Sequence, residues 1–129
     1  MERKYYIAGF LFGLLGIVIG AFGTHGLKPI LSPDSFISLE TGIKYQIYHS
    51  LLLLILGIII TSGHQLSRGI FYLLIFGIIL FSGSIYLLAT NTLTNVDFKV
   101  IALATPLGGS LLIIAWSWLL VHFIKLKKK

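Results

Sequence analysis

The residues of this chain that could take part in chemistry are mainly histidine, tyrosine, glutamine and hydroxyl side chains. His49 follows Tyr45 by four residues and Gln46 by three, so on a helix the three side chains lie close together. A histidine in this setting could act as a general base or pass a proton, with a tyrosine or a serine assisting it. The absence of cysteine excludes disulfides, thiolate nucleophiles and cysteine-ligated metal centres.

Long uncharged stretches surround these residues. Hydrophobic residues make up 57% of the chain and charged residues 11%, whereas soluble domains average about 25% charged residues. About 20 apolar residues suffice to cross the ~30 Å hydrocarbon layer, and the chain contains four stretches of that kind. The sequence therefore predicts one all-α domain over residues 1–129, an integral membrane four-helix bundle with spans at about 5–23, 43–62, 69–90 and 106–124.

An amphipathic helical extension is expected before span two. Ser32 is suited to cap a helix whose first residue is Pro33, and the next break in the pattern comes at Ser62 and Gly63. Such a helix is about 45 Å long, about 15 Å more than the hydrocarbon layer requires. We expect its first third to lie in the membrane interface, because it carries an apolar stripe. The stripe consists of Phe36, Leu39, Ile43 and Ile47. Glu40 and Lys44, four residues apart, are interpreted as a solvated pair on this helix.

Span four can begin in two ways. Thr105 and Pro106 suit the cap and the first residue of a helix, and we prefer this start. In the alternative, the helix begins near Val96 and is kinked at Pro106, which frees the carbonyl group of Ala102.

Five glycines of span one are spaced by four, three, four and three residues, so they form one line along a helix. This glycine seam consists of Gly9, Gly13, Gly16, Gly20 and Gly23. In a membrane, small residues let helix backbones approach closely, and the spacing favours left-handed packing. The seam predicts a tight helix contact, with a span of this chain or with a second subunit. Gly108 and Gly109 give span four a second site of close packing.

Lysine and arginine predict the orientation of the chain. The face with both termini and the loop around Arg68 holds seven basic residues and one acidic residue, and the other face holds three of each. Both termini should be cytoplasmic, because basic loops stay on that side. Trp116 and Trp118 lie toward the inner end of span four and are expected to anchor it in the interface. Expected partners are membrane lipid and a homo-oligomer or larger membrane complex, and nucleic acid is not among them.

Counted from the outer ends of their spans, His49 and Ser84 lie at the same depth. This predicts a polar pocket in the outer leaflet, lined by His25, Tyr45, Gln46, His49, Ser82, Ser84 and Thr105. The simpler interpretation is that these side chains form hydrogen bonds across helix contacts and bind no ligand. Two histidines supply half of a zinc shell, so no metal or other cofactor is expected.

Four motifs resemble one known family, the domain of unknown function 423 family of small bacterial inner-membrane proteins. They are Gly20–Leu27, Tyr45–His49, Leu80–Tyr86 and Thr105–Gly109, in this order and spacing. This chain has Thr24 where the family usually has alanine, and its linker at 91–100 looks longer and more charged. The resemblance implies a four-span fold in the inner membrane and no established activity.

Three function classes follow in order of preference. The first is a non-catalytic membrane protein that self-associates or serves as an accessory subunit. The second is a transporter or channel for a small ion or polar solute that uses the polar pocket. The third is an intramembrane enzyme acting on lipid, with His49 as base, although the sequence offers no acid to orient it.

Overall fold

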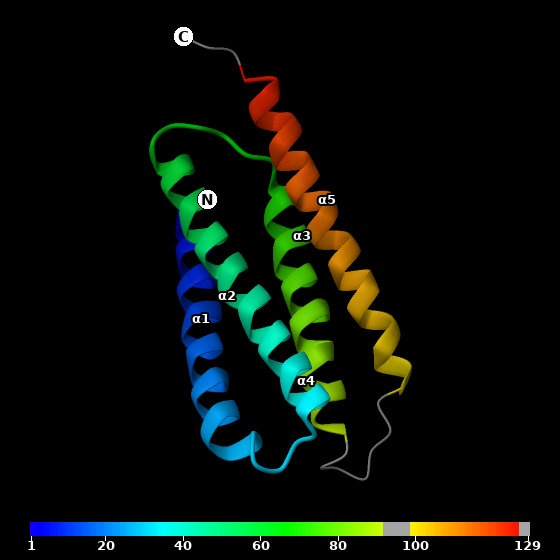
Figure 1. Ribbon diagram of the computed structural model, residues 1–129. Helices are drawn as coiled ribbons and strands as arrows, with labels where there is room; N and C mark the ends of the chain where they lie inside the picture. The colour runs from blue at the N-terminus through cyan, green and yellow to red at the C-terminus, as the bar shows by residue number, and fades with distance from the viewer. Residues whose placement is uncertain (92–98, 127–129) are drawn as a thin grey trace.

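The computed structural model describes residues 1–91 and 99–126, and every element in these ranges is helical. Four helical segments run up and down the molecule, and the start of the chain lies at the same end of the bundle as the end of α5 (Figure 1). By length and composition all four could cross a membrane, over Glu2–Leu27, Pro33–Thr61, Arg68–Ala89 and Ile101–Ile124. The prediction of an all-α chain with four membrane helices is confirmed.

The first two segments are α1 (Glu2–Phe22), which continues as a π-helix over Gly23–Leu27, and α2 (Pro33–Thr61). Ser32 caps α2, since its hydroxyl oxygen accepts a hydrogen bond of 3.1 Å from the backbone N–H of Ser35. The helix ends before Gly63, whose φ of +106° only glycine adopts readily. Both ends of α2 were predicted from the sequence and are confirmed.

The extension before span two is the first part of α2 itself. Its apolar stripe packs inside the molecule, where Leu39 is 1% exposed and clusters with Leu31 and Ala89. The extension thus continues the axis of the span, and it is not a separate helix lying flat on the membrane (Figure 1). Glu40 and Lys44 are both exposed, and no ion pair within 4.0 Å joins them.

Span three combines α3 (Arg68–Ile78), a π-helix at Ile79–Gly83 and α4 (Ser84–Ala89) without interruption. A π-helix accommodates one extra residue per turn, so α4 is rotated relative to the continuation of α3. This rotation sets which faces of Ser84 and the residues after it meet the neighbouring helices.

Span four is preceded by a 3₁₀-helix at Lys99–Leu103 and continues as α5 (Ala104–Ile124). The prediction that Thr105 caps this helix is wrong, because the preceding turn runs directly into α5 and Leu103 occupies the cap position. Pro106 is accommodated in the first turn, where a missing N–H is tolerated. The alternative start near Val96, most of the polar linker and Lys127–Lys129 lie outside the described residues.

The glycine seam faces α2 along its whole length. A Cβ atom would lie 2.7 Å from Leu54 at Gly9, 2.9 Å from Ile47 at Gly16 and 3.0 Å from Leu39 at Gly23. The other two glycines have ordinary contact distances to Ser50 and Ile43. The seam therefore packs against another helix of the same chain, and at three of its glycines an added methyl group would force a neighbouring side chain of α2 to shift.

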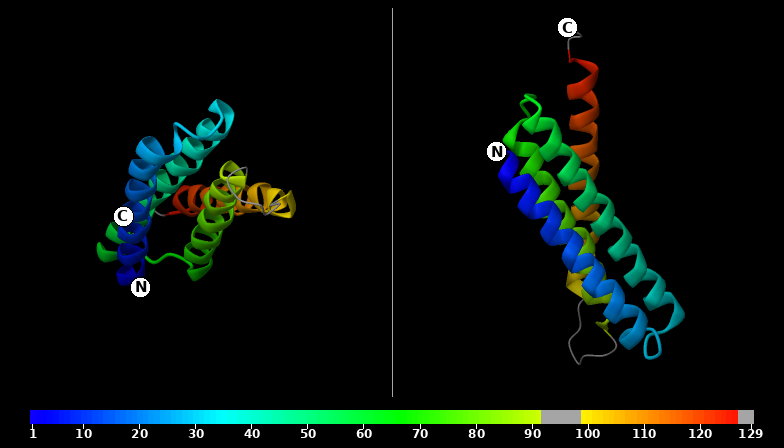
Figure 2. Two further views of the ribbon diagram at one scale, coloured as in Figure 1. Left: turned by 90° about the horizontal axis from the view of Figure 1, so that it is seen from below. Right: turned by 90° about the vertical axis from the view of Figure 1, so that its left-hand side faces the viewer.

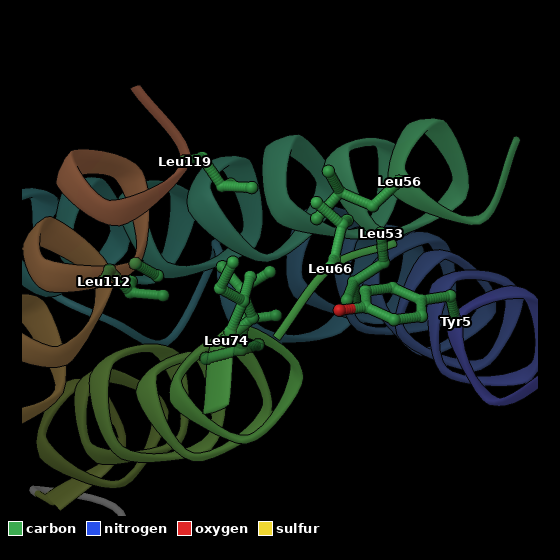
Figure 3. Packing of buried hydrophobic residues seen from close by; sticks show 10 residues of the cluster. Tyr5, Leu53, Leu56, Leu66, Leu74, Leu112 and Leu119 are labelled. Atoms are coloured by element: carbon green, nitrogen blue, oxygen red, sulfur yellow. The ribbon is translucent and has the colours of Figure 1, made fainter. Parts of the chain in front are cut away.

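Two helix pairs make up the bundle, α1 with α2 and α3 with α5 (Figure 2). The main core lies between the pairs and is filled by leucine, isoleucine and alanine side chains, with Tyr5 among them (Figure 3). Tyr5 is 0% exposed, its hydroxyl group points into this apolar cluster, and that oxygen has no hydrogen-bond partner among the described residues. Side-chain packing in this core fixes the relative position of the polar residues described next.

Candidate functional site

The seven polar residues predicted to form one pocket lie at several different helix contacts. Six are on the facing sides of α2, the second half of span three, and the start of α5. His25 lies on the π-helix that ends span one, is exposed, and forms no hydrogen bond with the other six in the part of the chain that the structure describes. The arrangement is therefore a chain of interhelical contacts, which we call the polar contact chain; its side-chain members are Gln46, His49, Ser82, Ser84, Tyr86, Thr105 and Trp116.

His49 joins α2 to α5. Its Nε2 atom lies 2.9 Å from the indole Nε1 of Trp116, and its Nδ1 atom lies 2.7 Å from the carbonyl oxygen of Tyr45. An indole N–H only donates, so Nε2 of His49 must accept that bond, and Nδ1 must then carry the proton and donate it to the carbonyl group. The ring is thus a neutral imidazole with both nitrogen atoms in use, and its side chain is 4% exposed. In this state His49 has no lone pair left for a metal ion or a substrate proton.

Gln46 joins three helical segments at once. Its amide nitrogen donates to the carbonyl oxygen of Phe12 in α1 over 2.8 Å, and its amide oxygen accepts from the hydroxyl group of Tyr86 in α4 over 2.6 Å. Gln46 is 4% exposed. The contact with Phe12 lies beside Gly16, where the missing side chain lets α1 come close to Gln46.

Two serines complete the polar contact chain. Ser82 donates to the backbone carbonyl oxygen of Gly42 over 2.8 Å and so fastens the π-helix to α2. Ser84 shares a hydrogen bond of 2.5 Å with Thr105 and so fastens α4 to α5. Both serines are buried. Each is used in helix packing, and neither lies beside the imidazole of His49 as a nucleophile would.

Tyr45 contributes mainly its ring and its backbone. The side chain is 43% exposed and contacts the rings of Tyr48 and Phe81 edge to face. Its carbonyl oxygen, one turn before His49, is the group that fixes the tautomer of the histidine. The tyrosine hydroxyl group forms no hydrogen bond with His49 or Gln46 in the ranges that the structure describes.

Sequence reasoning missed two members of the polar contact chain. Trp116 was interpreted as an interfacial anchor, but it donates to His49 from the middle of α5. No feature of the sequence near Trp116 points to this contact, because it depends on how α5 is rotated against α2. Tyr86 stands in one of the four motifs and was not assigned to the pocket, although it is four residues after Ser82 and hence one turn away from it.

A hollow does exist at the end of the bundle opposite the N-terminus. Its volume is about 450 Å³, and of the seven predicted residues only Thr105 lines it. Asp34, Ser35 and Ser38 from the first turns of α2 line one side, and Ile85, Leu88 and Ala89 of α4 line another. Among the described residues no three His, Asp or Glu side chains come together in a way that could hold a metal ion.

Comparison with known proteins places the chain in a family. The family model described as "Protein of unknown function (DUF423)" matches residues 19–109, which include the polar contact chain up to Thr105. The chain belongs to the DUF423 family. The resemblance carried by the four motifs is thereby confirmed.

Relatives across several bacteria match nearly the whole chain. It is 38% identical to a UPF0382 membrane protein of Staphylococcus saprophyticus over 96% of this chain and 99% of the relative. It is 34% identical to the UPF0382 membrane protein YwdK of Bacillus subtilis, over 95% of this chain and 98% of the relative. The UPF0382 inner membrane protein YgdD of Escherichia coli is also 34% identical, over 95% of this chain and 88% of the relative. No solved structure matches the chain.

These relatives and the four apolar helices place this DUF423 protein in the bacterial inner membrane. The family is uncharacterised and carries no named catalytic function. What the protein does must therefore be argued from its own residues.

Proposed function

We propose that this DUF423 protein is a non-catalytic membrane subunit, which associates with itself or with a larger complex of the inner membrane. The observation that carries the proposal is the state of His49, whose Nε2 accepts a hydrogen bond from Trp116 of α5 and whose Nδ1 donates to the Tyr45 carbonyl oxygen of its own helix. The most plausible reactive group of the sequence is thus used as a structural link. Gln46, Ser82 and Ser84 are used in the same way.

An enzyme acting on lipid would need a base with a free lone pair and an acid to orient it. In the described residues, the acidic side chains are Glu2, at the start of α1, and Asp34 and Glu40, in the first third of α2. None of them lies near the middle of a span, where His49 meets Trp116. These positions support a non-catalytic role over an intramembrane enzyme.

Transport is the second candidate, because ionisable and amide groups within a span often mark a solute pathway. The hollow beside Thr105 favours it as well, since Asp34, Ser35 and Ser38 give part of its largely apolar lining groups that could bind a small polar solute. Liposome flux assays with the wild-type protein and with His49→Ala test this function. Flux of an ion or polar solute that disappears in the variant would replace the first proposal by transport.

The outer surface of α1 supports association with a neighbour. This helix packs mainly on α2, and its opposite face presents Phe10 and Ile17, each 67% exposed, together with other large apolar side chains. A face of this kind can contact either lipid or a helix of another subunit. Association through it needs no rearrangement of the bundle.

Disulfide crosslinking in native membranes tests the proposal, and a chain without cysteine is well suited to it. Phe10→Cys and Ile17→Cys place a thiol on the outer face of α1, and Ser50→Cys is a buried control of nearly unchanged size, 2% exposed. We expect crosslinked dimers or heteromers for the first two variants and none for the control. The mass of the unmodified protein in mild detergent should likewise exceed that of a monomer. A monomer of unchanged mass that crosslinks to nothing would refute the proposal.

We also propose that both termini lie in the cytoplasm. Arg3, Lys4, Arg68 and Lys125 lie at the end of the bundle that holds the N-terminus, which fits the excess of basic residues on the inner side of the membrane (Figure 1). Single cysteines at Gln65, at this end, and at Lys28, at the opposite end, can be labelled with a membrane-impermeant maleimide in spheroplasts. Labelling of Lys28→Cys alone supports the orientation, and labelling of Gln65→Cys alone reverses it.

A further inference from the structure

A groove of about 700 Å³ runs between α3 and α5 on the outside of the bundle. Tyr72, Phe76 and Leu80 line it on the side of span three, and Leu111, Ile114 and Trp118 line it on the side of α5. Its lining is almost entirely apolar and aromatic, and it belongs to no part of the polar contact chain. We call it the α3–α5 groove.

The groove begins at the first turn of α3, at the end of the bundle that holds the N-terminus. Its outermost lining residue is Gly69, the second residue of α3, against which the ring of Trp118 packs so closely that a Cβ atom would lie 2.8 Å from it. Its innermost residues are Leu80 and Leu111, near the middle of their spans. From Gly69 to Leu80 a helix rises about 16 Å, which is close to half of the ~30 Å hydrocarbon layer. The groove therefore has the length of one leaflet.

Basic side chains lie close to the Gly69 end of the groove. The Nζ atom of Lys4 lies 4.6 Å from the ring centroid of Phe71 and 5.1 Å from that of Tyr72, which lines the groove. Arg68 directly precedes Gly69 and is exposed. Within the described residues neither side chain has a carboxylate within 4.0 Å, since Glu2 pairs with the N-terminal amine. The apolar groove thus ends in two positive charges that no carboxylate of the described residues neutralises within 4.0 Å.

We propose that the α3–α5 groove binds an anionic phospholipid, with an acyl chain along the groove and the phosphate group at Lys4 and Arg68. The acyl chain would contact an apolar groove as long as one leaflet, and the negative phosphate group would lie beside two positive side chains. A helix of a second copy fits less well, because it needs a contact along the full span. In the same orientation it would also bring the same positive charges to the same level. The proposal does not depend on whether the protein self-associates.

Trp118 provides the test, because it lines the groove while Trp116 points to His49. In the variant Trp116→Phe, Trp118 is the one remaining tryptophan, and lipids with brominated acyl chains quench its fluorescence on contact. Brominated phosphatidylglycerol and brominated phosphatidylethanolamine with identical chains are titrated into reconstituted full-length protein. We expect stronger quenching by phosphatidylglycerol at equal mole fraction, with a relative affinity lowered about fivefold for each charge removed by Lys4→Ala or Arg68→Ala.

A matched pair of controls removes two charges at the other end of the bundle, Lys28→Ala and Lys44→Ala. These variants should keep the preference for phosphatidylglycerol, and circular dichroism checks that every variant remains helical. Equal quenching by both lipids would overturn the proposal. So would an equal loss of the preference for phosphatidylglycerol in the groove variants, Lys4→Ala and Arg68→Ala, and in the two control variants. Trp118 shielded from both lipids would show that protein covers the groove instead. Native mass spectrometry of the unmodified chain, which should retain phosphatidylglycerol over phosphatidylethanolamine, gives an independent measurement.

Discussion

Adjacent glycines near the start of α5 should respond in opposite ways to the same substitution. At Gly108 a Cβ atom would overlap the backbone nitrogen of Phe81 and would lie 2.8 Å from the carbonyl carbon of Leu80. At Gly109 the nearest atoms are in the ring of Phe81, at 3.5 and 3.6 Å, an ordinary contact. A backbone in a buried π-helix cannot swing aside as the tip of a side chain can. In Gly108→Ala, α5 must therefore move away from span three by about 1 Å, which weakens the dispersion contacts along that interface.

The two effects on stability can be estimated from these distances. Overpacking of a close contact lowers the free energy of unfolding by about 1–3 kcal/mol. Replacing a helical glycine by alanine raises it by about 0.5–1 kcal/mol, because the unfolded chain loses conformational freedom. Gly109→Ala should raise the free energy of unfolding, because it has the entropic gain and no overpacking. In Gly108→Ala the loss from overpacking is reduced by the same gain. The two variants should thus differ by about 1–3 kcal/mol in favour of Gly109→Ala.

Unfolding by sodium dodecyl sulfate from mild detergent micelles measures this difference. Both tryptophans lie on α5, so their fluorescence follows its separation from span three, and far-ultraviolet circular dichroism follows the loss of helix. Gly108→Ala should unfold at a lower fraction of denaturing detergent than wild type, and Gly109→Ala at an equal or higher one. If the two variants unfold at the same fraction of denaturing detergent, the close approach of α5 to the π-helix is refuted.

Three further substitutions test the polar contacts and the core by the same unfolding assay. Gln46→Leu should lower stability by about 1–3 kcal/mol, because the hydroxyl group of Tyr86 loses its acceptor inside the bundle; restoration by a second change, Tyr86→Phe, checks the pairing. Trp116→Phe should lower the free energy of unfolding by about 0.6–2 kcal/mol, since Nε2 of His49 is left without a donor. The nitrogen NMR shifts of the His49 ring should then change only at Nε2. Tyr5→Phe should leave stability unchanged or raise it by up to about 1 kcal/mol, because it removes a buried hydroxyl group without a partner among the described residues; a loss above that size would indicate a bonded hydroxyl group.

Signals within a few residues of each other were sufficient for much of the fold. Ser32 and Pro33 mark the start of α2 and Gly63 its end, because capping and a positive φ depend on local chemistry. Hydrophobic length alone gives four membrane helices. The glycine seam predicts a close contact without naming the partner, and the structure assigns it to α2.

What could not be predicted depends on the rotation of one helix against another. The π-helix at Ile79–Gly83 leaves no mark in composition, yet it turns α4 so that Ser84 meets Thr105. Depth counting placed His49 level with Ser84, but depth alone does not fix which neighbouring helix a side chain faces. His49 pairs with Trp116, 67 residues away in the chain, a contact for which a single sequence offers no measure of distance or direction.

The pairing of α1 with α2 and of α3 with α5 bears on how the protein is made. Consecutive helices meet first as the chain leaves the ribosome, so each pair can enter the membrane as a hairpin of its own. The two hairpins become joined when Tyr86 reaches Gln46 and Trp116 reaches His49. Until then, the amide oxygen of Gln46 lies in the bilayer without a hydrogen-bond donor. A nascent chain that stops before residue 86 should therefore be recognised and degraded by membrane proteases.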